Sequence, residues 1–264
     1  RPKNTLGKHS KMLLGQVWDN TYLIAFFGRA MKMTQMSKRM KNHHQSNTNV
    51  PRSGAYYISG LYAITPNELA TSLLCKQVEA AIQGGAKLVQ YRNKTADAAL
   101  RLIQASALLV LCRSYNVPLV INDHLDLCAQ IDADGLHLGA TDSDIGAARR
   151  LLGADKIIGA SCYNRIDFAI KAEAAGASYV AFGACFGSQT KPDAIHAPLT
   201  LFAEAKQKIS IPLVAIGGIN LDNAAQVIAA GANAIAVVGA LFNASNMIKS
   251  SQEFTNLFKT TSTN

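Results

Sequence analysis

The chain lacks the features that would place it outside the cell or across a membrane. Its five cysteines are odd in number, and no two have the C-x-x-C spacing of a metal or redox motif. No apolar run approaches the roughly 20 residues of a membrane-spanning helix. The apolar stretch 21–28 is shorter than that, and no small-residue cleavage site follows it. Reduced thiols and a cytoplasmic location fit this pattern best.

Acidic residues are nearly absent from the first fifth of the chain. Residues 1–52 contain ten Lys and Arg and one acid, Asp19, whereas the other 212 residues contain 16 basic and 16 acidic groups. The net charge of +9 therefore belongs to this segment and says little about the folded body. Without a sustained apolar period, residues 1–55 are expected to form a disordered or non-native basic extension. An organelle transit peptide is the more specific alternative interpretation of this segment, and a nucleic-acid-binding arm is a weaker one.

From residue 56, short aliphatic runs alternate with longer helical patterns such as 67–83, 96–115, 164–175 and 221–230. The expected strands are 57–64, 87–92, 118–122, 134–138, 156–161, 178–183, 212–216 and 234–238. Strands that alternate with helices form a parallel sheet, and eight apolar units favour its closure into a (β/α)₈ TIM barrel. We therefore expect an α/β barrel over residues 56–250, followed by a C-terminal tail over 251–264.

An open, doubly wound sheet is the alternative architecture. Such a sheet usually carries a glycine-rich phosphate loop after its first strand, where this chain has Ile64-Thr65-Pro66-Asn67. Gly85, Gly176 and Gly231 each end a helical pattern just before a strand, as a left-handed helix cap requires. The barrel is the favoured fold.

Catalytic residues of a barrel lie at the carboxyl ends of its strands. The second strand ends with Gln90, Arg92 and Lys94, which share one face if the extended geometry continues. An amide and two cations there indicate an anion site, although a solvated loop is the plainer alternative. Asp123 follows Asn122 at the third strand, and Asp142 follows the fourth. These carboxylates suit Mg²⁺ beside a phosphate, or each caps the helix that follows it.

The remaining strand ends carry hydroxyls and glycines. His137 is either a ligand contact or a core histidine, and Ser161 ends the fifth strand. The polar loop 188–191 after the sixth strand is suited to closing over an anion. Glycines after the last two strands, including Gly218 and Gly239, let backbone N–H groups approach a phosphate. The rim thus offers two anion sites, as two phosphorylated substrates would need.

In combination and order, the motifs over about residues 56–245 closely resemble the thiamine phosphate synthase family. They are Gly60 to Thr65, Gln90-x-Arg92-x-Lys94, Ile121-Asn122-Asp123, Asp134 to Gly139, Ile158 to Ser161, Thr190-Lys191 and Ala215 to Ile219. The family joins hydroxymethylpyrimidine diphosphate to hydroxyethylthiazole phosphate, or its carboxylated precursor, and releases diphosphate. The resemblance implies small-molecule substrates and no nucleic acid or membrane partner, and it is compatible with a homo-oligomer.

The resemblance also implies roles for individual residues. The pyrimidine diphosphate would be bound by Gln90, Arg92, Lys94, Asn122, Ser161 and Lys191, with His137 near the ring and Tyr91, Asn93 and Gln189 also in the substrate site. Arg92, Lys94 and Lys191 would be the catalytic cations, and Asp123 and Asp142 would hold Mg²⁺. Ser188 to Thr190, Gly218, Val238 and Gly239 would hold the thiazole phosphate.

Three positions depart from the family pattern. Ala140 and Thr141 replace an amide and an acid, and Gly239 replaces a serine. These changes bear on affinity more than on reaction type. A thiazole tautomerase of the same barrel group is the nearest rival function, but Gln90 and the two aspartates argue against it. A non-catalytic phosphate-binding barrel is the more distant rival.

Deleting residues 1–50 is expected to leave turnover and melting temperature nearly unchanged, because the segment lacks the apolar period of a packed element. Trp18, the only tryptophan, provides the readout. We expect a solvent-like emission maximum in the full chain and the same melting temperature after truncation. A blue-shifted maximum together with a clear loss of melting temperature would show that the segment belongs to the fold.

Overall fold

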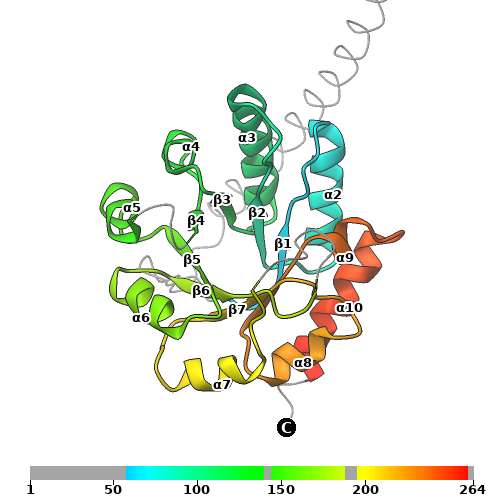
Figure 1. The fold of residues 1–264 in the computed structure, drawn as a ribbon. Coiled ribbons are helices and arrows are strands. Elements are labelled where there is room, and N and C mark those ends of the chain that lie inside the picture. The colour runs from blue at the N-terminus through cyan, green and yellow to red at the C-terminus, as the bar shows by residue number, and fades with distance from the viewer. Residues whose placement is uncertain (1–57, 140–143, 188–194, 261–264) are drawn as a thin grey trace, which may run out of the picture.

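The structure is a computed structural model that describes residues 58–139, 144–187 and 195–260. Eight parallel strands close into a barrel in sequential order, with β1 paired to β8 (Figure 1). The strands are β1 (Gly60–Ile64), β2 (Leu88–Tyr91), β3 (Leu119–Asn122), β4 (Gly135–Leu138), β5 (Ile157–Tyr163), β6 (Tyr179–Phe182), β7 (Leu213–Ile216) and β8 (Ala234–Val237). The expected (β/α)₈ barrel is confirmed, and the eight strands lie where the aliphatic runs predicted them.

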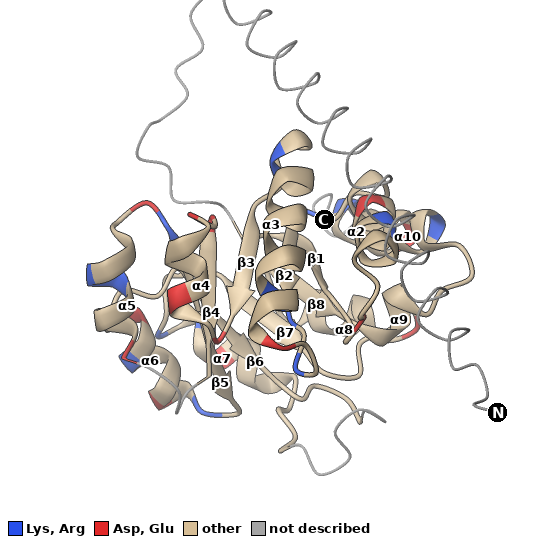
Figure 2. Cartoon of the chain, turned by 90° about the horizontal axis from the view of Figure 1, so that it is seen from above, with Lys and Arg blue, Asp and Glu red and all other residues tan. Residues whose placement is uncertain are grey.

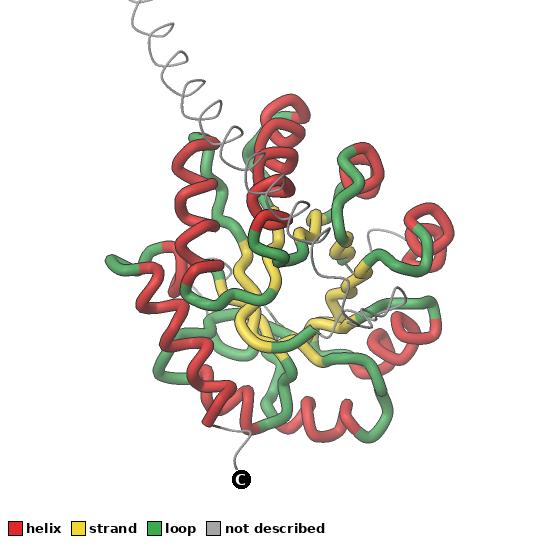
Figure 3. Tube along the Cα trace, turned by 180° about the vertical axis from the view of Figure 1, so that it is seen from behind, coloured by secondary structure: helices red, strands yellow, loops and turns green. Residues whose placement is uncertain are grey.

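A ring of helices surrounds the strands (Figure 3). The helices are α2 (Thr71–Gln83), α3 (Ala98–Ser114), α4 (Leu125–Gln130), α5 (Ile145–Leu152), α6 (Ile166–Ala174), α7 (Thr200–Lys206), α8 (Ala224–Ala229), α9 (Gly239–Phe242) and α10 (Met247–Thr260). Within the described ranges, no helix is both long and apolar enough to cross a membrane. The predicted glycine caps Gly85, Gly176 and Gly231 have φ values of +108°, +97° and +114°.

Side chains alternate between two cores along every strand, because successive residues of a strand point to opposite faces. An inner cluster that includes Tyr62, Val120 and Tyr179 fills the barrel. A larger outer cluster, including Leu61 and Val89, lies between the strands and the helices. Both faces of the sheet are therefore buried. None of the described strands contains a Lys, Arg, Asp or Glu, and Figure 2 shows the charges on the surrounding helices and loops.

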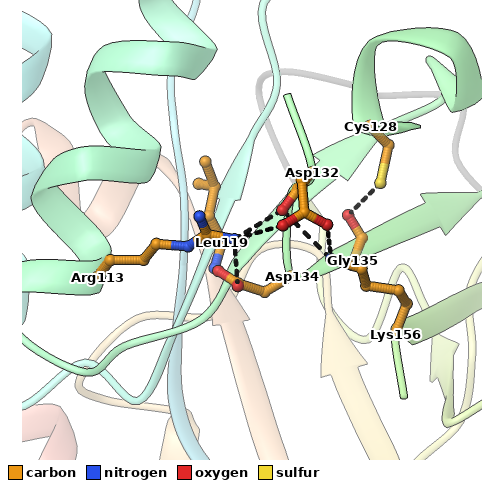
Figure 4. Close-up of polar contacts among 7 residues, drawn as sticks. All are labelled: Arg113, Leu119, Cys128, Asp132, Asp134, Gly135 and Lys156. Carbon is orange, nitrogen blue, oxygen red and sulfur yellow. Dashed lines mark hydrogen bonds and ion pairs between the residues drawn. The ribbon is translucent and has the colours of Figure 1, made fainter. Parts of the chain in front are cut away.

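Arg113, Asp132, Asp134 and Lys156 form a charged cluster that connects loops at the amino-terminal end of the barrel (Figure 4). Arg113 at the end of α3 donates to the backbone oxygen of Asp132 at 2.7 Å and lies 3.4 Å from a carboxylate oxygen of Asp134. The other Asp134 oxygen accepts from the backbone N–H of Leu119 at 2.9 Å, and Lys156 pairs with Asp132. Exposed ion pairs contribute little individually. Asp134 is mostly buried, however, and it joins the starts of β3 and β4.

The C-terminal helix α10 differs from the expected tail. It continues through residue 250, where the sequence pattern placed the end of the barrel domain, and Ser251 and Phe254 are both 0% exposed. The helix packs across the end of α2, since a Cβ atom built on Gly84 would lie 2.2 Å from Cβ of Ser251. Residues 251–260 thus form part of the packed domain. The expected basic extension, residues 1–55, lies outside the described residues.

Replacing Phe254 with Ala tests whether α10 is part of the core. Removal of a fully buried aromatic ring should lower the free energy of unfolding by about 3–5 kcal/mol, because the packing around α2 cannot close completely over the cavity. Denaturant-induced unfolding measures this change. The control Gln252→Ala, at an exposed position of the same helix, should change stability by less than about 0.5 kcal/mol. Equal stability of the two variants would contradict the packed role of α10.

Candidate active site

The carboxyl ends of the strands place polar side chains above the apolar inner cluster. Gln90 and Asn122 each lie two residues beyond an inward-facing residue of their strand, Leu88 or Val120, so they face the barrel interior as well. Ser161 lies four residues beyond the inward-facing Ile157, and His137 contacts both Ser161 and the inner Tyr179. Strand pairing aligns them around the barrel, with Asn122 opposite His137. Polar atoms in such an interior must find partners, because their burial is otherwise costly.

These partners form a chain of hydrogen bonds across the inside of the barrel. Gln90 donates from Nε2 to the hydroxyl of Tyr62 at 2.7 Å, and the Tyr62 and Tyr179 hydroxyls lie 2.8 Å apart. The Tyr179 hydroxyl lies 2.8 Å from Nδ1 of His137, and Nε2 of His137 lies 2.9 Å from Oγ of Ser161. We call these five residues the interior chain. It links β2, β1, β6, β4 and β5.

Burial keeps the interior chain uncharged. It lowers the pKa of His137 to about 4, against the opposing effect of the Asp123 charge. Burial also raises the pKa values of Tyr62 and Tyr179 well above the usual value for tyrosine. At neutral pH all three side chains are therefore neutral. They can orient a ligand by hydrogen bonding, and they contribute no fixed charge.

Space for Tyr179 comes from a glycine on the neighbouring strand. Gly159 pairs with Tyr179 across β5 and β6, and it pairs with His137 across β4 and β5. A Cβ atom on Gly159 would lie 2.1 Å from Cζ of Tyr179, so any larger residue would displace the ring. The Tyr179 ring stacks on the His137 ring at a centroid distance of 5.6 Å. The missing side chain at Gly159 thus permits the hydrogen bond to His137.

Charged groups gather beside the interior chain at the ends of β2 and β3. Nζ of Lys94 lies 3.7 Å from Oδ2 of Asp123, which also accepts from Nδ2 of Asn122 at 2.6 Å. Asp123 has a φ of +63°, a conformation that Asp adopts more readily than most residues. A cavity of about 240 Å³ opens here. It is lined by Tyr91, Asn93, Lys94, Arg101, Asn122, Asp123 and His124.

Arg92 is held by a residue that the sequence pattern did not single out. Thr65, which is 0% exposed at the end of β1, accepts from the Arg92 backbone N–H at 2.9 Å and donates to the Arg92 carbonyl at 3.0 Å. Burial lowers the pKa of the Arg92 guanidinium, while the Asp123 carboxylate raises it. The two contacts fix the backbone of Arg92 next to the interior chain. Thr65 occupies the loop in which the sequence analysis found no phosphate motif.

The side chains of Tyr91 and Asn93 form hydrogen bonds with other parts of the protein. The Tyr91 hydroxyl donates to Gln104 of α3 at 2.9 Å, and Nδ2 of Asn93 donates to the carbonyl of Glu68 at 2.7 Å. Oδ1 of Asn93 accepts from the N–H and the hydroxyl of Thr95. Both residues line the cavity, and these contacts also support the loop after β2.

The opposite side of the rim is built from glycines. Gly217 and Gly218 have φ values of +98° and +64°, and a Cβ atom on Gly218 would lie 2.5 Å from the carbonyl oxygen of Gly187. The loop after β7 therefore packs closely on the loop after β6. At Gly239 a Cβ atom would meet only Nδ2 of Asn243, at 3.6 Å, so the backbone after Val238 is open to a ligand. This side carries backbone N–H groups in place of charged side chains.

Part of the expected site lies outside the described residues, namely Asp142, Ser188, Gln189, Thr190 and Lys191. Among the described residues, no three His, Cys, Asp or Glu side chains form a metal-binding group. The contacts of Tyr62, Tyr179 and Thr65 in this region were not predicted from the sequence. The available signal was the position of each tyrosine at an inward-facing place of a buried strand, where a hydroxyl needs a polar partner.

Comparison with known proteins agrees with this geometry. The family model described as thiamine monophosphate synthase matches residues 61–241. A thiamine-phosphate synthase from Methylobacillus flagellatus is 55% identical over 201 residues, which cover 76% of this chain and 96% of the relative. A thiamine-phosphate synthase from Nitrosomonas eutropha is 52% identical over 201 residues, covering 76% and 95%.

A solved structure gives the same result. The thiamine phosphate pyrophosphorylase from Pyrococcus furiosus has a TM-score of 0.69 and 33% sequence identity, covering 76% of this chain and 96% of that chain. The family match spans well over half of this chain, from β1 to α9. The chain therefore belongs to the thiamine monophosphate synthase family.

Proposed function

We propose that this protein joins hydroxymethylpyrimidine diphosphate to hydroxyethylthiazole phosphate, or to its carboxylated precursor, and forms thiamine phosphate and diphosphate. The observation that carries the proposal is the placement of the Lys94–Asp123 pair directly beside the neutral interior chain. A charged site next to a neutral, hydrogen-bonding site matches a substrate that has a diphosphate at one end and a pyrimidine ring at the other.

The pyrimidine diphosphate binds at the ends of β2 to β5. Arg92 and Lys94 hold the diphosphate, while Asn122 and Ser161 add hydrogen bonds. Gln90 and His137 face the ring from the neutral interior chain. Lys191, outside the described residues, is expected to complete the cationic side from the loop after β6.

The carboxylates fit a divalent ion. The side chain of Asp123 is 30% exposed at the rim, and its backbone N–H donates to the carbonyl of His137 at 2.9 Å. The end of β3 thus lies next to the end of β4, beyond which Asp142 follows. One or two carboxylates beside a substrate phosphate are the usual protein ligands of Mg²⁺. Asp123 and Asp142 would hold the ion, which when bound neutralises charge on the diphosphate.

The thiazole phosphate binds on the glycine side of the rim. Gly218, Val238 and Gly239 present backbone N–H groups there, and Ser188 to Thr190 would add hydroxyl contacts. Backbone donors suit a phosphate that is held but does not react. The thiazole nitrogen would then face the pyrimidine carbon from which diphosphate departs.

The reaction needs stabilisation of a leaving group more than it needs a general base. As the C–O bond breaks, negative charge develops on the diphosphate, and Arg92, Lys94 and Lys191 offset it. The electron-rich pyrimidine carries the positive charge until the thiazole nitrogen captures it. The five cysteines are buried and form no disulfide, which supports a reducing, cytoplasmic setting.

Turnover is expected to require Mg²⁺. The assay measures diphosphate release with both substrates present, before and after addition of excess chelator. Activity should fall to background and return when Mg²⁺ is restored, because the diphosphate would otherwise depart with its charge only partly neutralised. Full turnover in excess chelator would refute the metal assignment of Asp123 and Asp142.

Arg92→Ala and Lys191→Ala should each weaken handling of the diphosphate substrate far more than that of the thiazole phosphate. The loss of a contact that strengthens as the leaving group departs costs about 2–4 kcal/mol of transition-state stabilisation. The turnover number would then fall about a hundredfold or more.

Steady-state kinetics with each substrate varied in turn measures the effect. The matched control is Lys208→Ala, which removes an exposed cation that pairs with Glu204 at 2.8 Å on the outside of the barrel. It should leave both kinetic constants within about twofold of the parent values. Unchanged turnover in the Arg92 and Lys191 variants would count against their role.

A further inference from the structure

The two tyrosines of the interior chain lie below the rim of the barrel. Tyr62 is 1% exposed and Tyr179 is 0% exposed, whereas the side chain of Lys94 at the rim is 55% exposed. Tyr179 forms hydrogen bonds with Tyr62 and His137, and His137 forms hydrogen bonds with Tyr179 and Ser161. Any effect of the tyrosines on a ligand at the rim would therefore pass through His137 and Ser161.

The distances alone leave the direction of three of the four links open, because a hydroxyl or a ring nitrogen can be either donor or acceptor. Gln90 contributes an amide proton to Tyr62. If Tyr62 accepted from Tyr179 as well, its own buried proton would have no partner among the described residues, which is costly. We therefore take Tyr62 as the donor to Tyr179, and Tyr179 as the donor to Nδ1 of His137. A ring nitrogen that accepts a hydrogen bond carries no proton, so the proton of the imidazole lies on Nε2. From there it is donated to Oγ of Ser161.

His137 can serve as such a link only while it is neutral. The ring is buried in the barrel and its two nitrogens contact neutral hydroxyls, so it carries one proton. A neutral imidazole has two tautomers, and the hydrogen bond at one nitrogen selects between them. The hydroxyl of Tyr179, 2.8 Å from Nδ1, is in position to make this selection.

We propose that Tyr179 is a positioning residue that holds His137 in its Nε2–H tautomer, so that the Ser161 hydroxyl keeps its proton for an acceptor at the rim. The inference rests on the proposed function, in which that acceptor is a diphosphate oxygen. In the other tautomer Ser161 would donate to Nε2 and turn only lone pairs toward the anion. A donor aimed at developing negative charge favours reaction, and a lone pair opposes it.

The two tyrosines are expected to differ in their effect. Removal of the Tyr179 hydroxyl takes away the direct donor to Nδ1, and the imidazole proton can then occupy either nitrogen. Removal of the Tyr62 hydroxyl leaves Tyr179 with its own proton, which can still be donated to His137. A purely structural role would predict similar effects, because both changes delete one buried hydroxyl.

Nitrogen-15 NMR of the histidine-labelled full chain reads the tautomer directly and needs no substrate. The His137 signals are assigned by their loss in His137→Gln. We expect Nε2–H in the unmodified protein and in Tyr62→Phe, and a mixture with Nδ1–H in Tyr179→Phe. Nδ1–H as the main tautomer of the unmodified protein, or an unchanged tautomer in Tyr179→Phe, would overturn the proposal.

Kinetics tests whether Tyr179 acts through Ser161. Tyr179→Phe should lower kcat about tenfold with KM within about twofold, the effect of losing one hydrogen bond that matters in the transition state. In a Ser161→Ala background, the same change should have no further effect. The control Tyr115→Phe deletes a hydroxyl that donates to Glu79 at 2.7 Å outside the barrel, and it should leave kcat unchanged. An equal tenfold loss in both backgrounds would refute action through Ser161.

The NMR and kinetic measurements separate this inference from the proposed function. If the unmodified protein forms no thiamine phosphate, the proposed function fails, and the tautomer populations still decide whether Tyr179 controls His137. If product forms but Tyr179→Phe leaves the tautomer unchanged, the positioning role fails alone.

Discussion

Closure of the sheet between β1 and β8 is the constraint on which the rest of the molecule depends. A closed parallel barrel has no free edge, and all its strands end on the same rim. Every second side chain must point into a narrow interior. An apolar residue there packs against the inner cluster, while a polar residue must bond to a polar residue from another strand. Gln90, Tyr62, Tyr179, His137 and Ser161 satisfy this requirement together.

The two ends of the barrel use polar groups for different purposes. At the amino-terminal end, Arg113, Asp132, Asp134 and Lys156 bond to one another and to the backbone, which joins neighbouring loops. At the carboxyl end, Lys94 and Asp123 lie 3.7 Å apart beside a cavity, and the backbone at Gly239 is open. The first arrangement leaves the charged groups occupied by each other. The second leaves the side chains of Lys94 and Asp123 partly exposed at the cavity.

The fold was predictable because its signals are local and repeated. Eight aliphatic runs and three glycine caps predicted the barrel. Strands that are apolar on both faces must be buried on both faces, and closure into a barrel surrounded by helices buries them. Individual roles were harder to predict. Asn93 lies at a strand end like the other predicted ligand residues, and its hydrogen bonds with Thr95 and Glu68 could not be read from the sequence. Phe254 follows the last strand-helix unit in a polar stretch, and only the contact of α10 with α2 buries it.

The interior chain was not predictable because it depends on distances between strands. Tyr62 and Tyr179 are 117 residues apart in sequence, and their hydroxyls meet only because Gly159 leaves room for the second ring. An inward-facing tyrosine signals that some partner exists and does not say which one. By contrast, Lys94 and Asp123 follow adjacent strands, so their contact could be inferred from the order of the motifs.

The central claim is that one rim brings together two phosphorylated substrates and joins them. Single-turnover product analysis of the full chain with Mg²⁺ tests it most directly. The account predicts equal amounts of thiamine phosphate and diphosphate when both substrates are present, and neither product when the thiazole phosphate is omitted. Isomerisation of a thiazole phosphate alone, or binding of both substrates without formation of a new bond, would contradict it.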